Sequence, residues 1–138
     1  MKLILYVDGG ARGNPGPAAI GVVLAKPDGP VLDELSETIG VATNNVAEYR
    51  ALLRGLERAL ELEATEVEIV GDSELVARQV SGVYKVKHPA MKPLHAEARG
   101  ALSQFERWHI RTVPREENAR ADELVNAALD RDFPGAAN

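Results

Sequence analysis

The chain has 138 residues, 45% of them hydrophobic, and its 21 acidic and 16 basic residues give a formal net charge of −5. This length and composition suit one folded domain and exclude a disordered chain, which would hold fewer apolar residues. The acidic balance argues against a protein that coats nucleic acid with a basic surface, although it allows an enzyme that reaches a phosphodiester through metal ions. The absence of cysteine excludes disulfides and thiolate zinc sites.

No apolar stretch approaches the length of a membrane span, and the first residues lack the successive zones of a signal peptide. We therefore expect one cytoplasmic domain over residues 1–138, monomeric and without a membrane partner. Its tail from about residue 132 is expected to fray, because chain termini without docking residues are poorly ordered.

Three strands are expected in the first part of the chain, over residues 2–8, 19–25 and 31–39, where the apolar residues cluster. Turns rich in glycine and proline separate them at residues 9–17 and 28–30. Connections this short favour antiparallel pairing of the three strands.

Helices and strands are expected to alternate in the rest of the chain. The strongest helical pattern covers residues 44–62, where Tyr49 and several leucines recur at helical spacing. Beyond it we predict, in order, a strand over 66–71, a helix over 73–81, an irregular segment over 84–93, a helix over 94–107, a strand over 109–113, a loop over 114–118 and a helix over 119–131. This order predicts an α/β fold, with a mixed five-stranded sheet and helices on both faces.

Four acidic residues, each in a different segment, are candidate metal ligands: Asp8, Glu48, Asp72 and Asp122. Asp8 and Asp72 end predicted strands, whereas Glu48 and Asp122 lean toward the apolar faces of predicted helices. A carboxylate withdrawn from water is costly unless it is paired or bound to a cation, and Mg²⁺ prefers carboxylate oxygens and water. The four residues are therefore expected to hold two ions at one face of the sheet.

Each acid also has a structural interpretation. Glu48 would serve equally as an edge residue that reaches solvent or pairs with an arginine. Asp72 or Ser73 would serve as the N-cap of the helix that follows. Asp122 would stabilise the first turn of its helix through the helix dipole. Asp8 has the weakest alternative of this kind, since the glycines after it permit close approach of a backbone or a ligand.

Three further segments have both a structural and a nucleic-acid interpretation. The loop over residues 13–17 is either a hairpin turn or a set of backbone amides open to a phosphate. Asn44 and Asn45 either cap a helix or recognise a ribose 2′-hydroxyl, the group that separates RNA from DNA. Lys85 and Lys87 form a solvated charge pair or contact phosphates along a duplex.

Four spaced motifs, taken in order, resemble the signatures of the ribonuclease H type 1 family. They are Asp8-Gly9-Gly10-Ala11-Arg12-Gly13-Asn14-Pro15-Gly16-Pro17, Thr43-Asn44-Asn45-Val46-Ala47-Glu48, Gly71-Asp72-Ser73 and Val113-Pro114-Arg115-Glu116-Glu117-Asn118-Ala119-Arg120-Ala121-Asp122. The resemblance spans residues 1 to about 130. It implies the ribonuclease H fold and a metal-dependent endonuclease that cleaves the RNA strand of RNA–DNA hybrids, leaving 5′-phosphate and 3′-hydroxyl ends.

The resemblance also implies roles for individual residues. Asp8 would bridge two Mg²⁺ ions, for which Mn²⁺ can substitute. Asp122 would help to hold the ion that activates the attacking water, and Glu48 and Asp72 the ion that stabilises the leaving 3′ oxygen. The residues implied in contacts with the hybrid are Asn14, Asn44 and Asn45 at 2′-hydroxyls, Thr43 at a phosphate of the DNA strand, and Asn118 beside the site.

The chain departs from well-studied members of this family in three respects. The loop before Asp122 has no histidine, and Arg115 in that loop is expected to hold phosphate or stabilise developing charge. Glu74 stands where the family often has glutamine, and its negative charge is expected to weaken substrate affinity. The long basic protrusion is replaced by a short segment from Tyr84 to Lys92, so affinity should be modest and sensitive to salt. These features resemble the shorter branch seen in archaea and some bacteria.

Other functions fit parts of the pattern. A nuclease of the same fold with another substrate would not need Asn44 and Asn45 to read 2′-hydroxyls. A non-catalytic module that binds nucleic acid would gain nothing from four acids facing phosphate. A small-molecule phosphatase is a further alternative, and cleavage assays on hybrid, duplex DNA and duplex RNA separate these functions.

Overall fold

The computed structural model describes residues 1–135, so the last part of the predicted frayed tail, residues 136–138, lies outside the described residues. The elements in chain order are β1 (Lys2–Ala11), β2 (Gly16–Ala25), β3 (Val31–Ala42), α1 (Asn44–Glu61), β4 (Glu66–Gly71), α2 (Glu74–Val80), α3 (Lys92–Leu102), β5 (Arg107–Thr112), the 3₁₀ turn η1 (Arg115–Asn118) and α4 (Ala119–Asp132). Within residues 1–135, no helix combines the length and the apolar character needed to cross a membrane.

The five strands form one mixed sheet in the order β3-β2-β1-β4-β5. The first three strands pair antiparallel, as their short connections predict, while β4 lies parallel to β1 and β5 lies parallel to β4. The predicted fold class is therefore confirmed. β1 lies at the centre of the sheet, where the antiparallel and parallel halves meet.

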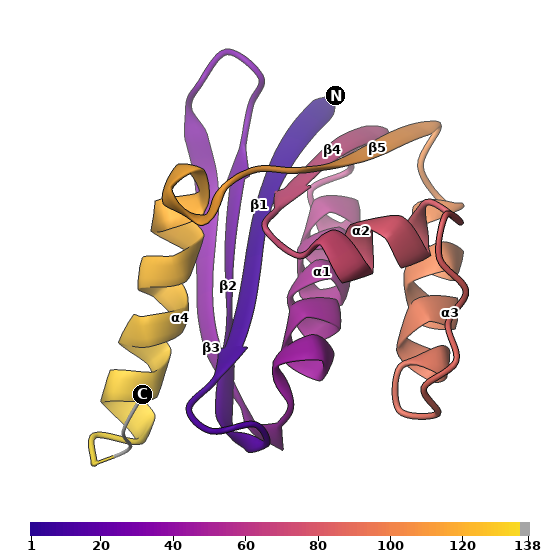
Figure 1. Cartoon of the computed structure of the whole chain (residues 1–138). Coiled ribbons are helices and arrows are strands. Elements are labelled where there is room, and N and C mark those ends of the chain that lie inside the picture. Colours follow the sequence, from indigo (N-terminus) through magenta and orange to yellow (C-terminus); the bar gives the residue numbers. More distant parts are fainter. Residues whose placement is uncertain (136–138) are drawn as a thin grey trace.

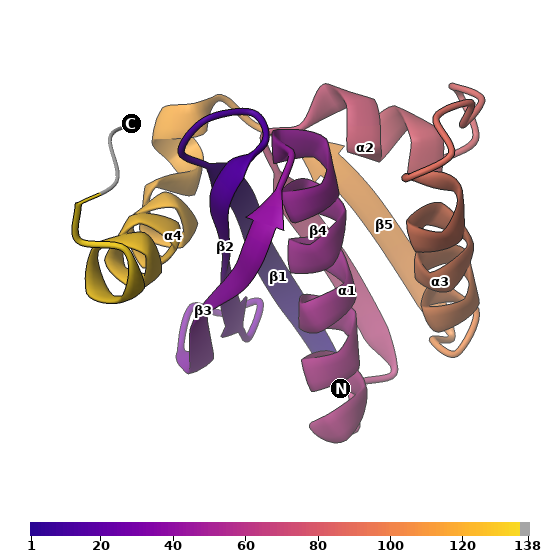
Figure 2. The same ribbon diagram turned by 90° about the horizontal axis from the view of Figure 1, so that it is seen from below.

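Helices cover both faces of the sheet, with α4 on one side and α1, α2 and α3 on the other (Figure 1). The view from below shows α3 beside α1, farther from α4 (Figure 2). The main core lies under α1, where side chains of the central strands point inward: Leu3, Leu5, Val7, Ile20, Val22 and Leu24. Burial of these apolar side chains supplies most of the stabilisation of this layer.

The second face has a smaller core beneath α4. Ala19 of β2 packs there against Val125 and Leu129 of the helix. Gly21 of β2 allows the helix to approach the sheet, because a Cβ at this position would clash with the carbonyl oxygen of Ala121. The close contact fixes the height of the first turn of α4 above the sheet.

β1 and β2 are longer than the sequence predicts. The glycine-rich segment expected as a turn over residues 9–17 continues the ladder instead, with Gly9 paired to Ile20 and Ala11 to Ala18. The turn is confined to residues 12–15. Glycine is usually a weak strand former, but here a buried neighbour strand and a close helix offset that preference.

The helix predicted over residues 94–107 is wrong at both ends. α3 begins at Lys92 and ends at Leu102, and residues 103–106 form turns. In these turns the amide of Glu106 donates to the carbonyl of Thr65 at 2.8 Å, which starts β5 beside β4. The chain therefore leaves the helix after Leu102 to pair with β4, although the local pattern of residues 103–107 favoured a helix.

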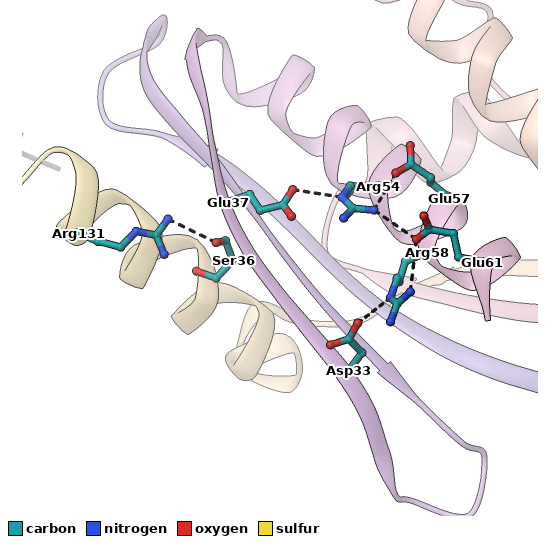
Figure 3. A network of polar contacts seen from close by, with 8 residues as sticks. All are labelled: Asp33, Ser36, Glu37, Arg54, Glu57, Arg58, Glu61 and Arg131. Carbon is teal, nitrogen blue, oxygen red and sulfur yellow. Dashed lines mark hydrogen bonds and ion pairs between the residues drawn. The ribbon is translucent and has the colours of Figure 1, made fainter.

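The edge strand β3 carries acidic side chains that pair with arginines of α1 beside it (Figure 3). Arg54 Nε donates to Glu37 Oε1 at 3.2 Å, and Arg58 Nε donates to Asp33 Oδ2 at 2.7 Å. We call these two arginines and two acids the β3 ion-pair network. Charges along an edge strand discourage pairing with another chain.

Candidate active site

The site forms where β1 continues past the end of β4. The two strands are parallel, and their last paired residues are Tyr6 and Val70. Asp72 directly follows the last residue of β4, Gly71, and lies beside Asp8 of β1. This is the carboxyl edge of the parallel strands, where α/β sheets hold ligands.

Glu48 reaches the same point from the start of α1. β4 no longer runs beside Gly9, and the Gly9 amide donates instead to Glu48 Oε1 at 2.6 Å. Only glycine fits at this position, because a Cβ would clash with the carbonyl of Ala47 in the helix. Glu48 is thus held by a backbone amide, rather than by the arginine that its sequence pattern also allowed.

The carboxylates of Asp8, Glu48 and Asp72 lie close together, with one oxygen of each within 4.8 Å of the others. Burial raises the pKa of Asp8 to about 7, and repulsion by Asp72 and Asp122 contributes to the same shift. Burial and then the charge of Asp8 raise the pKa of Glu48 well above its usual value, while the Gly9 amide opposes this rise. We call these three residues the acid cluster. Its three carboxyl groups repel one another when ionised, so a bound cation would stabilise their charged forms.

Asp122 approaches the acid cluster from the first turn of α4. It is close enough that its charge and a hydrogen bond help to raise the pKa of Asp8. Arg115 Nη2 donates to Asp122 Oδ1 at 3.1 Å, although the arginine side chain is 75% exposed. Arg115, which was expected to hold a phosphate, is therefore paired in this structure with the Asp122 carboxylate.

Two hydroxyl groups take the helix-capping roles that the sequence left open. Ser73 Oγ accepts from the amide of Val76 at 3.2 Å as the N-cap of α2, which leaves the Asp72 carboxylate free. Thr43 Oγ1 accepts from the amide of Val46 at 3.2 Å as the N-cap of α1. The neighbouring asparagines are therefore not needed as caps.

Asparagines join the turn between β1 and β2 to the start of α1. Asn14 Oδ1 accepts from the amide of Asn44 at 3.0 Å, and Asn44 Oδ1 accepts from the amide of Ala11 at 2.9 Å. Asn45 is exposed, and within residues 1–135 its side chain makes no hydrogen bond. The turn and the helix start thus form one wall, from which Asn45 projects.

This wall and the acids border one open groove of about 530 Å³. Among the residues that line it are Asp8, Asn44, Asn45, Glu48, Asp72, Arg115 and Asp122. Arg12 and Asn126 also line the groove, and sequence reasoning did not single them out. Asn126 follows Asp122 by one helical turn, so its spacing gave a signal, whereas Arg12 lies within the first motif without a local pattern that sets it apart.

Five residues predicted to bind substrate do not line this groove: Asn14, Thr43, Lys85, Lys87 and Asn118. Asn14 and Thr43 lie beside it, in the turn and just before α1. Lys85 borders a separate groove with Tyr84, between α2 and α3, and Lys87 is exposed in the same segment. Asn118 is only 3% exposed, and its Nδ2 donates to the carbonyl of Val7 at 2.8 Å. A direct contact between Asn118 and a substrate conflicts with this burial, because η1 folds against β1. Asn118 instead ties the start of α4 to the strand that carries Asp8.

The Glu74 carboxylate is held by two hydrogen bonds within the protein. Its Oε2 accepts from Arg78 Nε at 2.9 Å, and its Oε1 accepts from Thr112 Oγ1 at 3.0 Å. These hydrogen bonds lower the pKa of Glu74. Its charge is therefore offset by Arg78, and the expectation that it repels a substrate loses its basis.

Comparisons with known proteins agree with this geometry. A family model described as reverse transcriptase-like matches residues 6–128. A bifunctional protein of Mycobacterium tuberculosis is 49% identical over 99% of this chain, and the chain spans 38% of that protein's length. Ribonuclease HI of Halobacterium salinarum is 47% identical over 91% of the chain, which spans 63% of it.

Solved structures are similar over nearly the whole fold. The crystal structure of ribonuclease H1 from Halobacterium salinarum has a TM-score of 0.93 and 45% identity, and the match covers 95% of this chain and 99% of that one. A ribonuclease H1 isolated from compost, in complex with an RNA/DNA hybrid, has a TM-score of 0.89 and 50% identity, covering 94% of this chain and 97% of that one. With these matches and the acid cluster in place, the chain belongs to the ribonuclease H family, in which it is ribonuclease H1-like.

Proposed function

We propose that this chain hydrolyses the RNA strand of RNA–DNA hybrids in a metal-dependent reaction that leaves 5′-phosphate and 3′-hydroxyl ends. The observation that carries the proposal is the acid cluster, in which three segments distant in sequence bring carboxylate oxygens within 4.8 Å of one another. The similar compost enzyme, whose structure holds a hybrid, supports the choice of substrate. The chain would act as one monomeric ribonuclease H unit.

The donor set of the site fits hard divalent cations. It consists of carboxylate oxygens alone, and the raised pKa of Asp8 reflects first its burial and then repulsion by neighbouring acids, which a cation would relieve. Asp8, Glu48, Asp72 and Asp122 would hold two ions, with Asp8 serving both and Mg²⁺ or Mn²⁺ as the metal. When bound, such ions polarise the scissile phosphate and make an attacking water more acidic.

The chain's own residues would position these groups. The Gly9 amide donates to Glu48 Oε1 and so holds the Glu48 carboxylate beside Asp8 and Asp72. Asn118 holds the start of α4, and with it Asp122, against the strand that carries Asp8. Pre-organised ligands of this kind lower the cost of assembling the site when substrate arrives.

Recognition of the RNA strand would rest on the wall opposite Asp122. Asn45 offers an exposed amide to a ribose 2′-hydroxyl, and Asn14 and Asn44 extend the same surface. Thr43 would contact a phosphate of the DNA strand. The basic residues Lys85 and Lys87 would contact phosphates farther along the duplex, in a segment too short to form a long protrusion.

Arg115 would replace the histidine that the longer relatives carry in the loop before Asp122. Its side chain is 75% exposed, and its guanidinium donates to one oxygen of Asp122. A cation at Asp122 would compete with this ion pair and free Arg115 for a phosphate oxygen. The missing histidine and the short basic segment are the reasons for assigning the chain to the shorter branch of the family.

The test is a cleavage assay on end-labelled RNA–DNA hybrid, duplex DNA and duplex RNA, each with Mg²⁺, with Mn²⁺ and with a chelator. We expect cuts in the RNA strand of the hybrid, dependent on the metal, with 5′-phosphate ends. Cleavage of duplex DNA at the same rate would favour a nuclease with another substrate. Binding without cleavage under every condition would favour a non-catalytic module and refute the proposal.

A further inference from the structure

Arg12 is the most buried charged side chain of the groove that lies outside the acid cluster. Its side chain is 8% exposed, and its Nε has no hydrogen-bond partner among the described residues. A buried guanidinium with an unused donor is costly, and a methionine or leucine would fill the same space without that cost. The arginine therefore serves something other than packing.

The contacts of Arg12 lead across the groove to α4. Its Nη2 forms an ion pair with Asp130 Oδ1 at 2.7 Å and donates to Asn126 Oδ1 at 3.3 Å. Asn126 Nδ2 in turn donates to the carbonyl of Asp122 at 3.1 Å. The side chain of Arg12 is thus linked to the helix turn that presents Asp122.

The backbone of Arg12 leads in the other direction, into the wall that carries the asparagines. Its amide donates to the carbonyl of Pro17 at 2.8 Å and closes the turn between β1 and β2. The same turn holds Asn14, whose Oδ1 accepts from the amide of Asn44 at the start of α1. One residue therefore joins the two walls of the groove by its backbone and its side chain.

We propose that Arg12 is a positioning residue that fixes the separation between the asparagine wall and Asp122, and thereby aligns the bound RNA strand with the acid cluster. The inference rests on the proposed function. It deepens that function by naming the residue that sets the position of the RNA strand relative to the acid cluster. Arg12 acts through Asp130 and Asn126 and does not itself contact the substrate.

The first experiment compares Arg12→Met with Asp130→Ala in steady-state cleavage of a hybrid. Asp130 is 70% exposed, so Asp130→Ala keeps the fold even where Arg12→Met weakens it. We expect each variant to lower kcat/KM, with Arg12→Met between about 10-fold and 100-fold, the range typical of groups that orient a functional ligand. The double variant should lose no more than Arg12→Met, because both changes break one connection. Arg12→Lys should restore part of the loss.

Arg120→Met is the matched control. Arg120 also joins α4 to the sheet, through two hydrogen bonds of 2.8 Å to Glu34, but it lies away from the groove. This variant should lower the melting temperature and leave kcat and KM unchanged. A purely structural role of Arg12 predicts the same result for Arg12→Met, and that result would overturn the inference.

The second experiment needs no activity. Amide hydrogen exchange of the free protein should speed up at Asn44 and in the turn over residues 12–15 in Arg12→Met and Asp130→Ala, but not in Arg120→Met. If the unmodified chain cleaves no hybrid, the proposed function fails and exchange alone still decides the link between the walls. If Asp130→Ala changes neither exchange nor kinetics while Arg12→Met loses activity, Arg12 contacts the substrate directly and the positioning role is refuted.

Discussion

The acid cluster and the β3 ion-pair network contain the same kinds of carboxylates in opposite electrostatic situations. On β3, a hydrogen bond from Arg58 lowers the pKa of Asp33, and the network is complete within the chain. In the cluster, burial and neighbouring acids raise the pKa of Asp8 to about 7. The difference teaches that the number of acids does not mark a functional site. What marks it is charge that the fold leaves without a partner.

The strongest way to break this comparison is to remove one carboxylate from each region. Asp8→Asn should abolish cleavage, with a loss larger than the roughly 10–100-fold seen when a group that merely orients a metal ligand is removed. Its melting temperature without metal should stay the same or rise, because repulsion in the cluster falls. Asp33→Asn is the control and should leave cleavage unchanged. An active Asp8→Asn protein would remove Asp8 from the metal site.

Arg115 pairs with Asp122 beside the acid cluster, and its removal tests whether the chain uses an arginine where relatives use a histidine. Arg115→Ala should lower the single-turnover rate by about 10-fold to 100-fold, the size of one lost hydrogen bond to a charged group. Replacement of His88, His95 and His109 by alanine should cost far less than the roughly 10²–10⁴-fold typical of general acid–base catalysis. A collapse of activity in the histidine-free protein, with its fold verified by circular dichroism, would reverse this assignment.

Asn45 sharpens the comparison on the substrate side, because it is an exposed polar group without a protein partner in the described residues. Asn45→Ala should lower kcat/KM for hybrid by up to about 10-fold, as expected for one hydrogen bond of roughly 1 kcal/mol. The loss should disappear when the facing 2′-hydroxyl is replaced by hydrogen. Substrates with single deoxynucleotides near the cut locate that hydroxyl. Equal cleavage of an all-DNA strand would show that the asparagine does not read ribose.

The pH dependence of stability should differ between the two regions. Without divalent cations, the free energy of unfolding should fall as pH rises from about 4 to about 7, because folded Asp8 keeps a proton that the unfolded chain, with a pKa of 3.8, has released. Asp8→Asn should reduce this slope, and Asp8→Asn combined with Glu48→Gln should flatten it, because the pKa of Glu48 is raised as well. Urea unfolding in a chelator at several pH values measures the slope. A slope that survives in the double variant would place its origin elsewhere.

The smallest effect is expected in the β3 ion-pair network. Arg58→Met should lower the free energy of unfolding slightly, because the pair with Asp33 is partly exposed and screened by solvent. The loss should shrink further in high salt and leave cleavage unaffected. A large loss, or one insensitive to salt, would mean that this network is more than a surface feature.

Local pattern was enough to find the sheet and the acids. Asp8 and Asp72 follow apolar strands, and Glu48 lies at the start of a strongly amphipathic helix, so each carried a signal within its own segment. The antiparallel order of β1, β2 and β3 followed from short turns. These features depend on neighbours in sequence, which a single chain displays.

Features that depend on distant partners were not predictable. Asn118 was expected at the substrate, but the carbonyl of Val7 takes its amide. Glu74 was expected to repel the substrate, but it accepts a hydrogen bond from the distant Thr112 as well as one from its helical neighbour Arg78. The role of Arg12 depends on α4, more than a hundred residues later in the chain, so no local pattern announces it.

The convergence of four segments on one groove has a consequence for the timing of synthesis. Asp122 stands on α4, the last helix of the described chain, and reaches the acid cluster only after that helix docks on β2. A nascent chain that has emerged only as far as β5 carries three of the four acids and lacks the wall formed by α4. The proposed nuclease would therefore stay inactive until α4 has emerged from the ribosome and docked on β2.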